Sequence, residues 1–112
     1  MNASLMPPSI FRVDAAKITA YLLNPHHPVG RSKALYFMAR GFNINRPDEL
    51  ADALLNHPRT GRLVGALHNG FVDQFVYEGA LIGPRSTVPR IRSVWKVDPG
   101  GTVGLLVTAY PY

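Results

Sequence analysis

The sequence LVGALHNGFVDQFVY, residues 63–77, marks the point at which the pattern of this chain changes from helical to strand-like. Two runs of apolar residues flank the dipeptide Asn69-Gly70, and Asn-Gly in this setting is typical of a two-residue turn in a β-hairpin. Further turn signals at 83–86 and 99–102 divide the rest of the chain into two more segments of strand length. The C-terminal half therefore predicts an antiparallel sheet of about four strands.

Upstream of this point, apolar residues recur at helical spacing. Helices are expected near residues 14–23, 32–40 and 47–56, separated by loops that contain proline and glycine. Helices followed by an antiparallel sheet favour an α+β architecture, with the N-terminal helices packed on one face of the C-terminal sheet. We expect a single domain over 1–112, with residues 1–12 as a loose N-terminal tail.

Charge and composition narrow the classes of function. Twelve Lys and Arg residues stand against seven Asp and Glu residues, which gives a formal net charge of +5, and nine of the twelve cations are arginines. Because the planar arginine fork suits bidentate phosphate binding, we expect nucleic acid as the leading class of partner, with an acidic protein as the alternative. The chain has no cysteine, which excludes disulfides, thiolate nucleophiles and cysteine-based zinc sites.

The sequence lacks the signals that are typical of several other classes of protein. No segment approaches the ~18 apolar residues of a membrane span, and the N-terminus lacks a cationic start followed by an apolar run. We therefore expect no membrane association and a cytoplasmic site of action, with export as a toxin left open. The glycine motifs of nucleotide-binding proteins and the Gly-x-Ser-x-Gly elbow are missing, so we expect no cofactor. No carboxylate cluster stands near the histidines, so we expect no metal site.

Alternation along residues 90–97 separates an apolar face, which contains Trp95, from a basic face formed by Arg90, Arg92 and Lys96. Because the apolar face packs on the core, the basic face is expected to face solvent or a ligand.

The last strand ends in Thr108 and Tyr110, and we expect a register that places both hydroxyls beside Arg92. Hydroxyls next to a guanidinium suit a phosphate group. The alternative is that the cations form a solvated sheet face and that Thr108 and Tyr110 are present because strands favour such residues.

Histidine is the first side chain to consider for proton transfer in a chain without cysteine. His27 lies in a loop stiffened by proline, six residues before Lys33 at the start of the second expected helix, and Arg31 lies between them. Loop and helix start could present an imidazole and an ammonium to one anion. The alternative is that His27 only makes hydrogen bonds within its own loop.

Three segments together carry a resemblance: YLLNPHHPVGRSKA at 21–34, IRSVW at 91–95 and VTAYP at 107–111. They resemble an uncharacterised bacterial domain family with the pattern LLNPxHPxGxxKA, then VRTVW, then a terminal LVTAYP. In its order of helices and strands and its closing Thr-x-Tyr-Pro, that domain is similar to the toxin ribonucleases of the barnase, EndoU, colicin and RelE superfamily, which cleave RNA without a metal ion. The chain departs from the pattern at Gly104-Leu105, where the family has Pro-Arg, so the phosphate site is either reduced or completed by Arg90.

The resemblance implies a metal-independent endoribonuclease that cleaves RNA to a 2′,3′-cyclic phosphate. His27 would act as base or acid. Lys33 and Arg92 would stabilise the phosphate, while Thr108 and Tyr110 would position it or donate a proton. The residues that would bind RNA outside the catalytic set are Arg90, Lys96 and Arg31.

Expected partners are RNA and an acidic antitoxin or immunity protein, and the sequence gives no indication of oligomeric state. Two other interpretations stay open. One is a non-catalytic basic module that binds RNA or an acidic protein. The other is an accessory protein of a toxin–antitoxin or phage-related locus that acts only through protein contact.

Overall fold

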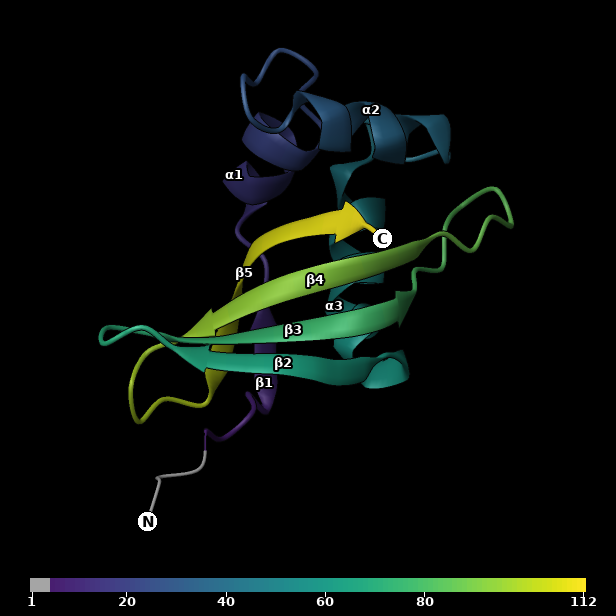
Figure 1. The fold of residues 1–112 in the computed structure, drawn as a ribbon. Helices are drawn as coiled ribbons and strands as arrows, with labels where there is room; N and C mark the ends of the chain where they lie inside the picture. Colours follow the sequence, from purple (N-terminus) through teal and green to yellow (C-terminus); the bar gives the residue numbers. More distant parts are fainter. Residues whose placement is uncertain (1–4) are drawn as a thin grey trace.

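The computed structural model describes residues 5–112 as a twisted sheet with helices at one face and at one end (Figure 1). In chain order the elements are β1 (Ile10–Arg12), α1 (Ala15–Lys17), the π-helical turn η1 (Ile18–Leu22), α2 (Arg31–Ala39), α3 (Pro47–Thr60), β2 (Arg62–His68), β3 (Asp73–Ala80), β4 (Arg90–Val97) and β5 (Val103–Pro111).

The described residues form a sheet of five strands in the order β1-β5-β4-β3-β2. Strands β2 to β5 are antiparallel neighbours, in agreement with the predicted hairpin and the two following strands. Strand β1 adds a fifth member that runs parallel to β5, pairing Ile10 with Val103 and Arg12 with Leu105. The α+β class holds, and the predicted count of about four strands agrees with the antiparallel part of the sheet. The parallel strand β1 is the addition that the sequence did not predict.

Strand β1 also corrects the expected tail. Residues 1–4 of that tail lie outside the described residues, but 10–12 form a strand. The Phe11 ring packs edge-to-face against Trp95 at 5.0 Å and against Tyr77 at 5.8 Å between ring centres. A strand of three residues is too short to show a period of two, so the sequence pattern could not reveal it.

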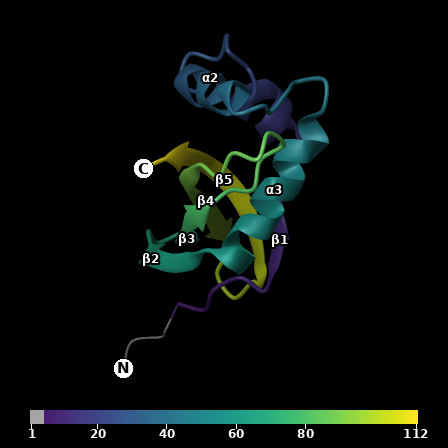
Figure 2. The same ribbon diagram turned by 90° about the vertical axis from the view of Figure 1, so that its right-hand side faces the viewer.

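The helices occupy two places. Helix α3 lies along one face of the sheet, where it contacts β2, β3 and β4, whereas α1 and α2 contact β5 (Figure 2). The prediction that the N-terminal helices pack on one face is therefore correct for α3, while α1, η1 and α2 gather near the end of β5. Helix α3 also runs past its expected end at residue 56 and continues to Thr60, so Pro58 does not end the helix but lies buried in its last turn.

The core lies between α3 and the sheet face that it covers. The predicted alternation along β4 holds in the main: Ile91, Ser93, Trp95 and Val97 are buried, whereas Arg90 and Lys96 are exposed. The exception is Val94, which lies on the other face and is also buried. Helix α3 contributes Leu50 and Leu54 to this layer. The other large side chains that are fully buried include Ile18, Leu22, Leu23, Phe37, Phe75, Leu81 and Leu106.

The β2–β3 hairpin turns over four residues, 69–72, rather than the two that Asn69-Gly70 predicts. His68 pairs with Asp73, and the Asn69 side-chain oxygen accepts the amide hydrogens of Phe71 and Val72 at 3.0 Å each. Gly70 has φ +94°, which fits its place in a tight turn. The asparagine side chain thus holds a longer turn together.

Candidate functional site

The sheet face opposite α3, here called the outer face, faces the viewer in Figure 1. Across it, Glu78 of β3 pairs with Arg92 of β4, which pairs with Tyr110 of β5. Thr108 lies opposite Val94, one step along the same face. The expected register is therefore observed: both hydroxyls lie beside Arg92, with Tyr110 directly opposite.

A β-bulge at Val107 makes this arrangement possible. Strict alternation would place Leu106 on the same face as Thr108 and Tyr110, but the register shifts at this point, since Val94 pairs with Thr108 and Trp95 pairs with Leu106. Leu106 is consequently buried in the core while Thr108 faces outward. Bulges of this kind re-aim side chains and are common beside functional sites.

Tyr21, in η1, connects the loop of His27 to β5. Its hydroxyl shares a hydrogen bond of 2.9 Å with Thr108 Oγ1. The His27 ring lies edge-to-face against the Tyr21 ring, with 5.0 Å between centres. The ammonium groups of Lys17 and Lys33 lie 5.5 Å and 5.7 Å from the centre of the same ring, within cation–π range.

These contacts surround a hollow of about 670 Å³, here called the His27 hollow, whose walls include Lys17, Tyr21, His27 and Thr108. The structure therefore brings together three predicted site residues around Tyr21, namely His27, Lys33 and Thr108. Tyr21 itself was not predicted, because its spacing in the sequence assigns it to the apolar face of a helix. Lys17 was not predicted either, because a single lysine on a short helix has no distinguishing pattern.

His27 makes the loop contacts that the alternative interpretation expects. Its Nδ1 accepts the amide hydrogens of Val29 and Gly30 at 3.0 Å and 2.9 Å. Two donors at Nδ1 fix the neutral tautomer, so the ring proton is on Nε2. Since Nε2 makes no hydrogen bond to the described part of the chain, the ring is held by one nitrogen and offers the other as a donor.

Arg92 is paired with a carboxylate that the sequence did not single out. Its Nε and Nη2 both lie 2.9 Å from Glu78 Oε2, and Arg62 Nη2 lies 3.6 Å from Glu78 Oε1. The hydrogen bond from Arg92, supported by the charge of Arg62, lowers the pKa of Glu78, and the same contact raises the pKa of Arg92. The outer face thus carries an ionised carboxylate between two guanidinium groups.

Arg90 lies at the end of the row and contacts the last residue. Its Nε donates to the Tyr112 hydroxyl at 3.2 Å, and the Arg92 guanidinium lies 5.0 Å from the centre of the same ring. Arg90 therefore sits beside the Arg92–Tyr110 pair and away from the His27 hollow. Arg31 is exposed at the start of α2, and Lys96 lies at the opposite end of β4.

His57 belongs to a buried network in the core. Trp95 Nε1 donates to Ser93 Oγ at 2.8 Å, Ser93 Oγ lies 2.7 Å from His57 Nδ1, and His57 Nε2 lies 3.1 Å from the Gly79 carbonyl oxygen. A carbonyl only accepts, so Nε2 carries the proton and Nδ1 accepts from the serine hydroxyl. Burial lowers the pKa of His57, which keeps the ring neutral and structural.

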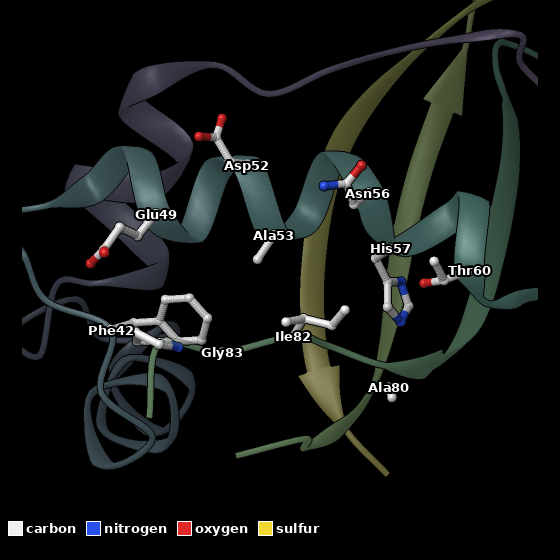
Figure 3. A pocket seen from close by; sticks show the side chains of 11 residues that line it. Phe42, Glu49, Asp52, Ala53, Asn56, His57, Thr60, Ala80, Ile82 and Gly83 are labelled. Carbon is white, nitrogen blue, oxygen red and sulfur yellow. The ribbon is translucent and has the colours of Figure 1, made fainter. Parts of the chain in front are cut away.

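A second cavity, of about 310 Å³, lies between α3 and the segment after β3 (Figure 3). Glu49, Asp52 and Asn56 are among its lining residues, and the described residues that line it include no lysine or arginine. Figure 3 shows His57 projecting from α3 toward Ala80, with Asp52 projecting in a different direction from an earlier turn of the helix. This cavity has no cation for a phosphate, unlike the His27 hollow.

Metal-binding and membrane-spanning features are not found in the described part of the chain. Residues 5–112 contain no group of three or more His, Cys, Asp or Glu side chains placed to hold a metal ion. Within the same range, no helix has both the length and the apolar character needed to cross a bilayer.

The chain belongs to the family DUF6883, a domain of unknown function that matches residues 8–112. Its fold is similar to one chain of a contact-dependent growth inhibition toxin–immunity protein complex from Klebsiella pneumoniae 342, with a TM-score of 0.68 and 21% sequence identity over 88% of this chain and 91% of that chain. No curated protein matches. Membership of an uncharacterised family agrees with the resemblance seen in the sequence, whereas the link to the ribonuclease superfamily stays a prediction.

Proposed function

We propose that this chain is a toxin-like endoribonuclease that cleaves RNA without a metal ion, by attack of the 2′-hydroxyl and formation of a 2′,3′-cyclic phosphate. The observation that carries the proposal is the gathering of His27, Lys33 and Thr108 around Tyr21, next to the Arg92–Tyr110 pair on the same strand face. The hollow itself is lined by Lys17, His27 and the residues that carry the two hydroxyls, Tyr21 and Thr108, and Lys33 lies against the Tyr21 ring. Cations, hydroxyls and an imidazole in and beside one hollow suit a phosphodiester.

The phosphate would lie between the His27 hollow and Arg92. Lys33 and Arg92 stabilise the charge of the pentavalent phosphorane, and Thr108 positions a phosphoryl oxygen. His27 donates a hydrogen bond from Nε2, because its Nδ1 is already an acceptor for two amides. A neutral imidazole in this role binds the phosphate and does not itself exchange a proton.

Glu78 and Tyr110 flank Arg92 and supply the proton transfers. The ionised Glu78 carboxylate accepts the proton of the 2′-hydroxyl as the 2′-oxygen bonds to phosphorus. The bond from phosphorus to the 5′-oxygen then breaks, and the Tyr110 hydroxyl gives that oxygen its proton. Proton exchange with water restores both side chains.

The fold likeness to one chain of a toxin–immunity protein complex supports a role like that of a toxin or of an immunity protein, and it supports a protein partner. With a net charge of +5, the complementary partner is an acidic immunity protein or antitoxin that covers the outer face.

A second candidate is a non-catalytic module that binds RNA or an acidic protein through the same face. Two contacts favour it: Glu78 already occupies Arg92, and His27 Nδ1 is committed to its loop. A binding module needs only the basic surface and no proton transfer.

Incubation of the purified chain with mixed RNA in EDTA separates the candidates. The ribonuclease proposal expects fragments that end in a 2′,3′-cyclic phosphate, seen by phosphorus NMR, at equal rates with and without EDTA. RNA that is bound but stays intact would establish the binding module instead. Cleavage that stops in EDTA would overturn the metal-free mechanism.

A further inference from the structure

Next to the His27 hollow lies another, of about 320 Å³, here called the Lys96 hollow. Its walls include Asp14, Lys17, Gln74 and Lys96. The two hollows share Asp14, Lys17 and Val107, so they form one path from the loop of His27 past the bulge of β5 to the far end of β4. Lys17 stands at the junction.

The cations of this path are available to a ligand. Neither Lys17 nor Lys96 forms an ion pair with any residue between 5 and 112, in contrast to Arg92. Lys96 is exposed, and its partners across the sheet are Gln74 and Leu105, neither of which carries a charge. Two ammonium groups that line one hollow, neither of them paired with a carboxylate of the described residues, suit consecutive phosphates of a strand.

The other polar groups that line the Lys96 hollow, Asp14 and Gln74, suit a base more than a phosphate. Asp14 stands at the N-cap position of α1, yet its side chain makes no capping hydrogen bond, so within residues 5–112 its carboxylate is an acceptor open to a ligand. The Gln74 amide offers both a donor and an acceptor. A carboxylate repels phosphate but accepts a hydrogen bond from the exocyclic amino group of a base, and the adjacent Leu105 and Val107 supply apolar surface.

We propose that the Lys96 hollow is a nucleotide subsite, which binds a base with an exocyclic amino group together with the phosphate that connects it to the scissile position. Lys17 binds the connecting phosphate, Lys96 the next one, and Gln74 with Asp14 the base edge. The proposal rests on the proposed function in taking RNA as the ligand. It adds that the chain recognises single-stranded RNA longer than a dinucleotide.

The test measures binding separately from cleavage. Fluorescence anisotropy with 2′-O-methyl oligonucleotides of mixed sequence, which lack the attacking hydroxyl, compares hexanucleotides with dinucleotides. The parent should bind the hexanucleotide on the order of tenfold more tightly, since each extra contact to a base or phosphate adds affinity. In Lys96→Ala the dependence of log affinity on log salt should become shallower by about 0.7, because the variant neutralises one phosphate fewer.

Variants and a control locate the effect. Gln74→Ala and Lys96→Ala should each reduce the preference for the hexanucleotide, and Asp14→Asn should change which bases are preferred. Arg59→Ala is the matched control, because Arg59 is an exposed cation in the last turn of α3 on the other side of the sheet. It should leave the length preference unchanged.

The outcomes distinguish the two proposals. A length preference that is lost in the Gln74 and Lys96 variants, in a protein that cleaves no RNA, would support the subsite and overturn the ribonuclease. Cleavage by a parent that binds both lengths equally would overturn the subsite alone. A length preference that Arg59→Ala reduces as much as Lys96→Ala would also overturn it, because the effect would then come from overall charge.

Discussion

The hydroxyl of Tyr21 and Oγ1 of Thr108 lie 2.9 Å apart although 87 residues separate them in sequence. This hydrogen bond fixes the π-helical turn to the outer face of β5, and the Tyr21 ring in turn contacts His27, Lys17 and Lys33. The position of the His27 loop relative to the strand therefore depends on one tyrosine.

Removing this hydrogen bond should destabilise the fold by about 1 kcal/mol, the usual net value for a partly buried hydrogen bond. Tyr21→Phe keeps the ring and its contacts, and Thr108→Val keeps the shape of the strand. Urea unfolding of both single variants and the double variant gives the coupling energy, which should be favourable and of similar size. Strictly additive losses would show that the two hydroxyls do not interact in solution.

Replacing Glu78 should have opposite effects on binding and on cleavage. Glu78→Gln removes the charge that competes with phosphate for Arg92, so RNA affinity at low salt should rise a few fold, and the gain should shrink as salt screens the site. Cleavage should fall, because the amide does not accept the 2′-hydroxyl proton. Arg92→Ala should weaken RNA binding instead.

Asp48→Asn is the matched control for Glu78→Gln. Asp48 pairs with Arg46 at 3.8 Å in an exposed position at the start of α3, so the variant removes one negative charge away from the outer face. Equal gains in RNA affinity from both substitutions would mean that net charge, and not release of Arg92, is responsible.

Much of the fold could be predicted because its signals are local. The Asn69-Gly70 turn and the alternation in β4 are each visible within a few residues of sequence. The β2–β3 hairpin and β4 are found where they were expected. The β1 pairing and the bulge at Val107 depend on contacts between distant segments. No local pattern marks them.

The candidate site was partly predicted for the same reason. His27, Lys33, Thr108 and Arg92 belong to conspicuous segments, whereas the roles of two other residues depend on tertiary structure. The sequence spacing assigns Tyr21 to the apolar face of a helix, but in the structure its hydroxyl reaches Thr108 on β5. Glu78 could not be aligned with Arg92, since the long connection between β3 and β4 does not fix a register in the way that a tight turn does.

Stability should decline below neutral pH because of His57. Burial lowers its pKa in the folded state, so the unfolded chain binds a proton first as the pH falls below about 6.5. The stabilising effect of the neutral, hydrogen-bonded ring is complete above that pH. This stabilising effect is lost as the pH falls toward the lower pKa of His57 in the folded state. The free energy of unfolding then decreases by no more than about 1.4 kcal/mol for each pH unit.

Urea unfolding at pH 8 and pH 5 tests this for the parent and for His57→Gln. The variant should be less stable at pH 8, because the Ser93 and Gly79 contacts are disturbed, but its stability should change less between the two pH values. An identical pH dependence in both proteins would assign the effect to the exposed histidines instead.

The decisive prediction for the enzyme concerns Nε2 of His27. His27→Ala removes both the Nδ1 acceptor and the Nε2 donor, whereas His27→Asn retains an acceptor for the loop amides. Asparagine already does this elsewhere in the chain, where the side-chain oxygens of Asn24 and Asn43 accept amide hydrogens two residues on, at 2.9 Å and 2.8 Å.

If Nε2 stabilises the phosphorane, both variants should slow cleavage by roughly 10²-fold or more. Tyr110→Phe should do the same, because it removes the proton donor. Cleavage of mixed RNA in EDTA, after circular dichroism has shown that all variants are folded, gives the rates. A His27→Asn protein as active as the parent would reduce His27 to a support for its loop, and an undiminished Tyr110→Phe would place the proton donor elsewhere.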